Sequence, residues 1–381
     1  LISWAQAGDS VGESGVDNDI MHRTMGLAED FPEEIAYQYL VLYMLDGYPV
    51  VPGSSQSSEI LACVDRYDTL YREELMAEDS EDERLAHMKK LTGIYLKLGD
   101  TAKGAAYAQR AAEETGDPFL TEQAMYGYFM LAQGEECLEL AEAALKEDPD
   151  SFIALSYAGR AAMLLDDYPA VADYGVRLSD IAKESDDPYA DYMLYQFVSY
   201  LTVEDSWYAM SDRFPGAACY HELPEEQLKQ IQENEYLNAY IQAFAASTDN
   251  TVVDLGYYRW EDPEGERALE LADALISMKE EAGFPHYIRG MVLNGVDRYE
   301  EAIREYTAAL AQQPDEHYIW YALGACYEEL GDLQNAQQAF QISLDIMPKI
   351  GSSHTGDWTG VSVHAGFALE RVRGQLAQGG N

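Results

Sequence analysis

Residues 8–12 read Gly-Asp-Ser-Val-Gly, the residue order of a serine-hydrolase nucleophile elbow. That motif activates its serine only on a tight strand-to-helix turn at the top of a sheet. Here it lies in a stretch, 8–20, that is rich in Gly, Ser and Asp and has no apolar period, ahead of a chain whose patterns are helical. We therefore assign no hydrolase chemistry to it.

His221 and Glu222 begin like the helix of a zinc protease, which needs a second histidine in the fifth position. That position holds Glu225, and Pro224 interrupts the turn. The seven histidines show no metal-ligand spacing, and the sequence has no glycine-rich phosphate loop. We predict a chain that is not an enzyme and uses no metal or cofactor. An active site near the 205–223 segment is the remaining enzymatic alternative, and it would need perturbed carboxylates in a deep pocket.

The chain is strongly acidic, with 69 Asp and Glu against 24 Lys and Arg and a formal net charge of -45. Nucleic-acid binding needs a basic surface that neutralises phosphates, and anionic membranes attract basic segments, so the charge argues against both. No run of 18 apolar residues is present to span a membrane. The expected partner is a protein or peptide, and the charge favours a basic one.

The four cysteines, at positions 63, 137, 219 and 326, are too far apart in sequence to form a zinc or redox motif. Cys137 and Cys326 fall inside predicted helices at places that need small packing residues. We predict buried thiols and no disulfide framework.

The N-terminal residues resemble the end of a cleaved targeting signal. The sequence starts at Leu1, and Ala5-Gln6-Ala7 has the small-x-small form of a signal-peptidase site. The expectation is a protein that is exported, placed in the cell envelope or imported into an organelle. The alternative is a cytoplasmic protein.

A repeat of 34 residues dominates the C-terminal half, and it is clearest at residues 317–348. That segment resembles the tetratricopeptide repeat (TPR) at its pattern positions: Trp320, Leu323, Gly324, Tyr327, Ala336, Phe340 and Pro348. Small residues in such a pattern sit where two antiparallel helices cross closely, and large ones fill the space between hairpins. Stepping back by one period, Gly324 maps to Gly290 and Ala336 maps to Ala302.

The resemblance implies an all-α fold, a TPR-like right-handed superhelix (α-solenoid) of antiparallel helical hairpins. The predicted organisation is a mobile leader at 1–30, an N-terminal helical hairpin at 31–83, three divergent TPR-like repeats at 84–184, a degenerate hairpin with an inserted loop at 185–248, three well-matched repeats at 249–350, and a capping helix and tail at 351–381.

In the TPR family the first helix of each repeat lines a concave wall that holds peptides or partner helices. The resemblance implies that this groove is lined here by Tyr257, Trp260, Tyr287, Met291, Tyr318, Tyr321 and Glu328. Some members clamp acidic peptides with Lys and Asn, but this chain has Tyr287, Met291, Tyr321 and Ala325 at those places. The predicted function is a peptide- or protein-binding module, and the alternative is a scaffold or assembly subunit of a larger complex.

One repeat departs from the acidic composition. Residues 84–116 carry six Lys or Arg against three Asp or Glu. Lys89, Lys90 and Lys97 could form a contact patch for an acidic segment, or could simply match acidic neighbouring repeats.

Overall fold

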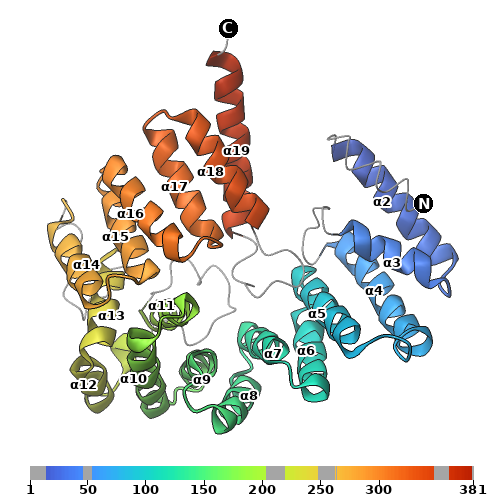
Figure 1. Cartoon of the computed structure of the whole chain (residues 1–381), viewed down its shortest axis with the longest axis horizontal. Helices are drawn as coiled ribbons and strands as arrows, with labels where there is room; N and C mark the ends of the chain where they lie inside the picture. Colours follow the sequence, from blue (N-terminus) through green and yellow to red (C-terminus); the bar gives the residue numbers. More distant parts are fainter. Residues whose placement is uncertain are drawn as a thin grey trace. The chain divides into compact units, whose positions relative to one another are not determined.

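The computed structural model describes residues 14–45, 54–202, 219–247, 262, 264–346 and 360–379. Every regular element within these residues is a helix, which confirms the predicted all-α class (Figure 1). The chain divides into two compact units, one running to Gly127 and the other starting at Tyr128.

The first unit stacks helices in chain order around one hydrophobic core. The core includes Val64, Leu91 and Tyr95, which are almost fully buried. Its helices are α2 (Ser14–Asp30), α3 (Ile35–Met44), α4 (Ser55–Glu74), α5 (Glu81–Lys97), α6 (Thr101–Thr115) and the beginning of α7 (Pro118–Met130).

The predicted mobile leader at 1–30 is wrong for residues 14–30, which form α2; residues 1–13 lie outside the described part. Met21, Met25 and Ala28 are buried in the core of the first unit. They stand at i, i+4 and i+7, one face of a helix, so a signal was present in an otherwise polar stretch. Gln38 Nε2 on α3 donates to the Ala28 carbonyl at 2.7 Å and ties α2 to the next helix.

The second unit repeats the same arrangement, with consecutive helices packed against one another. Its elements are α8 (Gly134–Glu147), α9 (Phe152–Leu164), α10 (Tyr168–Glu184), α11 (Pro188–Thr202), the short 3-10 helix η1 (Cys219–Glu222), α12 (Glu225–Glu233), α13 (Glu235–Ser247), α14 (Glu266–Met278), α15 (Gly283–Gly295), α16 (Tyr299–Gln312), α17 (His317–Glu329), α18 (Leu333–Ile346) and α19 (Gly360–Gly379).

Asn234 divides the apolar pattern of 224–246 into two helices, α12 and α13. Its side-chain oxygen accepts from the Leu237 N–H at 2.9 Å and so caps α13. The same oxygen accepts from the Ser179 hydroxyl, which joins the break to α10. Most of the expected insertion at 205–223 lies outside the described residues.

Glycine on one helix faces an aromatic ring on the next in the well-matched hairpins. A Cβ atom at Gly290 would lie 2.5 Å from the Tyr306 ring, and one at Gly324 would lie 2.7 Å from the Phe340 ring. In the α9–α10 hairpin both helices carry glycine, Gly159 and Gly175, and Phe197 of α11 fills the space between them. The glycines therefore allow the close helix crossings that the sequence pattern predicts.

In five hairpins the turn after the first helix contains a residue with a left-handed backbone conformation (positive φ). It is glycine at Gly99 and Gly331, where positive φ carries little strain, but it is Ala132, Asp166 and Asp297 in the other three. Successive examples at 99, 132 and 166 show the repeat period in backbone geometry even where the sequence has diverged.

Replacing Gly290 by leucine should overpack the α15–α16 crossing against Tyr306 and cost about 1–3 kcal/mol of unfolding free energy. The matched control is Gly374→Leu on α19, where an added Cβ meets nothing within 4 Å. Chemical denaturation should show a large loss for the first variant and almost none for the second. Equal losses would contradict the assigned crossing.

Ala132→Gly should stabilise the chain. Alanine with φ of 55° is in the left-handed region, which costs an L-residue about 1–2 kcal/mol that glycine avoids. Ala161→Gly, inside α9, is the opposite control and should destabilise. A lower melting temperature for Ala132→Gly would contradict the strained-turn assignment.

Candidate functional site

Five tyrosines from three helices of the second unit lie together, and we call them the tyrosine cluster: Tyr189, Tyr192, Tyr195, Tyr287 and Tyr318. The first three belong to α11, and the others to α15 and α17. Ring centroids are 5.3 Å apart for Tyr189 and Tyr192, and also for Tyr287 and Tyr318. The Tyr195 ring lies 5.9 Å from the Tyr287 ring and 6.4 Å from the Tyr318 ring. Phe284 links the two groups, because its ring contacts both Tyr192 and Tyr195.

Phe284 is the fully buried base of the tyrosine cluster. The Tyr195 ring stacks on it with centroids 4.5 Å apart, and the Tyr192 ring lies at 5.7 Å. Tyr189, Tyr195, Tyr287 and Tyr318 are half-buried, so each ring is held by the core while part of its surface meets solvent. Burial raises the pKa of Tyr287 and of Tyr318, so their hydroxyls stay protonated at physiological pH.

Asp191 fixes α11 to α15 beneath the tyrosine cluster. Its side chain is buried and accepts from the Phe284 N–H at 2.9 Å and from the Tyr240 hydroxyl at 3.3 Å. A carboxylate at the first turn of α15 also suits the positive end of the helix dipole. Burial raises the pKa of Asp191 to about 6, although the Phe284 N–H and the Lys279 charge oppose that rise.

Glu316 is a second buried acid, immediately before α17. Burial raises its pKa to about 8, against the opposing hydrogen bond with Tyr318. This carboxyl is therefore mostly neutral at pH 7 and adds little negative charge beside Tyr318.

The residues predicted to line a groove divide into separate groups. Tyr287 and Tyr318 belong to the tyrosine cluster, and Met291 packs in the same core. Tyr321 instead contacts Phe340 and packs with the α18–α19 core. Both carboxylate oxygens of Glu328 accept from Arg371 of α19, each at 2.7 Å. Tyr257 and Trp260 lie outside the described residues.

Sequence reasoning missed the three tyrosines of α11. Tyr189, Tyr192 and Tyr195 recur every third residue along α11, so their shared face was visible in the spacing. Asp187, immediately before α11, accepts from the Tyr189 N–H at 2.9 Å. The 185–248 segment was set aside because its repeat pattern is degenerate.

The three lysines of the suggested basic patch all make contacts within the first unit. Lys89 pairs with Asp117 at 2.8 Å, and Lys90 lies 5.6 Å from the centre of the Tyr39 ring. Lys97 donates to the Leu45 carbonyl at 3.4 Å. These contacts agree with an internal role, and a contact with an acidic segment stays a prediction.

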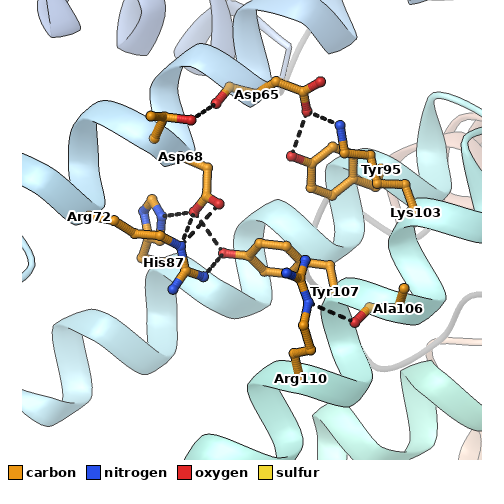
Figure 2. Close-up of polar contacts among 10 residues, drawn as sticks. Asp65, Asp68, Arg72, His87, Tyr95, Lys103, Ala106, Tyr107 and Arg110 are labelled. Atoms are coloured by element: carbon orange, nitrogen blue, oxygen red, sulfur yellow. Dashed lines mark hydrogen bonds and ion pairs between the residues drawn. The ribbon is translucent and has the colours of Figure 1, made fainter.

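A polar network joins α4 to α5 and α6 in the first unit (Figure 2). Asp68 accepts from Tyr107 at 2.9 Å and from Arg72 at 3.1 Å, and His87 lies 3.4 Å away. Asp65 accepts from Tyr95 at 2.9 Å and from Lys103. Burial alone would raise the pKa of Asp68, but His87, Arg72 and Tyr107 outweigh it and lower that pKa.

Within the described residues, no three or more His, Cys, Asp or Glu side chains group closely enough to hold a metal. Cys137 and Cys326 are buried free thiols, as predicted. The described helices include none that is long and apolar enough to cross a membrane.

Residues 289–349, which run from α15 past the end of α18, match the family model for the tetratricopeptide repeat. This part of the chain is therefore a tetratricopeptide-repeat segment. The tyrosine cluster includes Tyr287 and Tyr318, two of the residues that the sequence resemblance predicts to line a groove. No curated protein matches the chain in sequence.

Three solved structures illustrate how distant the structural likenesses are. A thermophilic TPR protein of Thermus thermophilus is 19% identical, with 65% of this chain and 97% of that chain covered and a TM-score of 0.33. Yeast Tom70 is 13% identical, with 95% and 73% covered and a TM-score of 0.44. A human IFIT1 dimer with PPP-AAAA is 16% identical, with 87% and 73% covered and a TM-score of 0.31. Such distant likenesses support no inference about partners.

The polar network should make the first unit sensitive to acid. The folded-state pKa of Asp68 lies below its unfolded value of about 3.9, so the ionised carboxylate stabilises the fold above that pH. Its contribution is lost as pH falls through the folded pKa. Asp68→Asn should lower the melting temperature at pH 7 and flatten its decline in acid, whereas Asp173→Asn, at an exposed position, should change neither. Parallel pH curves for Asp68→Asn and the parent would contradict this role.

Proposed function

We propose that this protein is a non-enzymatic binding module that holds a protein or peptide segment against the tyrosine cluster. The observation that carries the proposal is the set of half-buried tyrosines which α11, α15 and α17 bring together over Phe284. The TPR family and its partner-binding first helices support it.

The chemistry of the cluster suits apolar anchor residues of a partner. Tyrosine offers a large contact area with few rotatable bonds, and therefore loses little entropy on binding. The rings are already held by Phe284 and by one another, so a partner meets a surface that needs little further ordering.

The net charge of the protein indicates which residues should flank the apolar anchors of a bound segment. A chain with a formal net charge of -45 attracts cationic partners at a distance and speeds their encounter. We therefore propose apolar anchors flanked by Lys or Arg. Salt should slow association more than it speeds dissociation.

Selection from a random peptide library displayed on phage tests the proposal. The selected peptides should lose affinity by about tenfold or more, or about 1.4 kcal/mol, when Tyr287 and Tyr318 are both replaced by alanine. Phe367→Ala on α19, which removes a 69% exposed aromatic ring outside the cluster, is the control and should bind normally.

The melting temperature of each variant must be followed, because both tyrosines are half-buried. If the double alanine variant unfolds, the paired Tyr→Leu variant retains apolar bulk and should still bind less well through loss of the ring and hydroxyl. Failure to select any peptide, or unchanged binding by folded cluster variants, would overturn the proposal.

A further inference from the structure

Arg160 is a buried cation with no acidic partner among the residues that the structure describes. It lies on α9 and is only 4% exposed. Its Nε donates at 3.3 Å to the Ser156 carbonyl of the same helix, whereas Nη2 has no hydrogen-bond partner. No described carboxylate lies within ion-pair distance of it, in a chain with 69 acidic residues.

Aromatic rings surround the Arg160 guanidinium. Its central carbon lies 4.0 Å from the ring centre of Tyr157, 5.2 Å from that of Phe129 and 5.6 Å from that of Tyr200. Ring faces attract a cation, which offsets part of the cost of removing the charge from water. They do not provide the planar pair of acceptor oxygens that a guanidinium binds best.

Arg160 also keeps its charge. Burial lowers the pKa of its guanidinium, but the neighbouring tyrosines and Cys137 outweigh that effect and raise it. A buried charged group with an unpaired donor, here Nη2, costs free energy that a bound anion would recover.

We propose that Arg160 binds a carboxylate, supplied by an Asp or Glu side chain of the partner segment. A monoanionic carboxylate forms a neutral pair with one guanidinium. A phosphate dianion would leave one negative charge unpaired within an already acidic protein. The arrangement is a single arginine among aromatic rings and contains no Lys or Asn clamp.

Helix α11 connects this position to the tyrosine cluster. Tyr200 lies beside Arg160, and Tyr192 is among the tyrosines that act on its charge. Tyr192 also contacts Phe284 at the base of the cluster. A segment bound along α11 could place apolar anchors on the cluster and an acidic side chain at Arg160. The inference that the carboxylate comes from a partner segment rests on the proposed function, but the inference that Arg160 binds an anion does not.

Acetate is the probe for the anion site, and the full chain is the sample. At pH 7 and constant ionic strength, replacing chloride by acetate should raise the melting temperature of the parent. The rise should disappear in Arg160→Met, which retains contact with the rings, and persist in Arg177→Met, which removes an arginine with a 38% exposed side chain.

An equal rise in Arg160→Met and the parent would overturn the site. If Arg160→Met does not fold, the side-chain N–H resonances of Arg160 in the parent must shift on acetate addition, and unshifted resonances would overturn it. A larger effect of inorganic phosphate that also requires Arg160 would overturn the carboxylate assignment.

Peptide selection identifies the source of the carboxylate. Peptides selected on the parent should share an Asp or Glu that is absent from peptides selected on Arg160→Met, while both sets retain apolar anchors. Peptides without a shared acid would overturn the partner as source. A selection that yields no peptide would overturn the proposed function, and the acetate result would still decide the anion site.

Discussion

The close approach of two helices at a glycine facing an aromatic ring is the constraint on which the second unit depends. Gly290 against Tyr306 and Gly324 against Phe340 leave no room for even one methyl group. Interiors this dense tolerate few changes of volume, so each crossing fixes the position of the next helix along the array. The α15–α16 crossing also positions Tyr287 of the tyrosine cluster, whose ring centroid lies 5.9 Å from that of Tyr306.

Helix α11 shows how this constraint leads to the candidate site. Phe197 occupies the space left by Gly159 and Gly175 and thereby locks α11 against α9 and α10. Asp191 on the same helix then caps α15 through the Phe284 N–H. With α11 fixed on both sides, Tyr192 and Tyr195 come to rest on Phe284, and Tyr200 comes to rest beside Arg160.

The fold class could be predicted from the sequence because small and large residues recur at the same positions of each 34-residue repeat. Helix α2 was missed because its three buried residues are spread through a polar stretch. The composition of that stretch indicates a mobile segment, and only the spacing of the three residues indicates a helix. The α11 part of the site was missed for a different reason. In the well-matched repeats, the aromatic residue that packs on the glycine comes from the second helix of the same hairpin. In the α9–α10 hairpin that residue is Phe197, which comes from the next helix, α11. The packing is therefore preserved, although the aromatic residue is missing from its usual position in the repeat sequence. Tyr321 packs with the α18–α19 core, and Glu328 accepts a hydrogen bond from Arg371 of α19. These contacts involve residues outside the repeat, so the repeat pattern could not predict them.

The central claim is that partners bind on the tyrosine cluster, and fluorine NMR of the full chain labelled with 3-fluorotyrosine tests it most directly. Resonances can be assigned by single Tyr→Phe replacements and followed as a selected peptide is added. The account predicts that the signals of Tyr195, Tyr287 and Tyr318 shift, while those of Tyr95 and Tyr107, in the polar network of the first unit, stay in place. Shifts confined to Tyr95 and Tyr107 would contradict it.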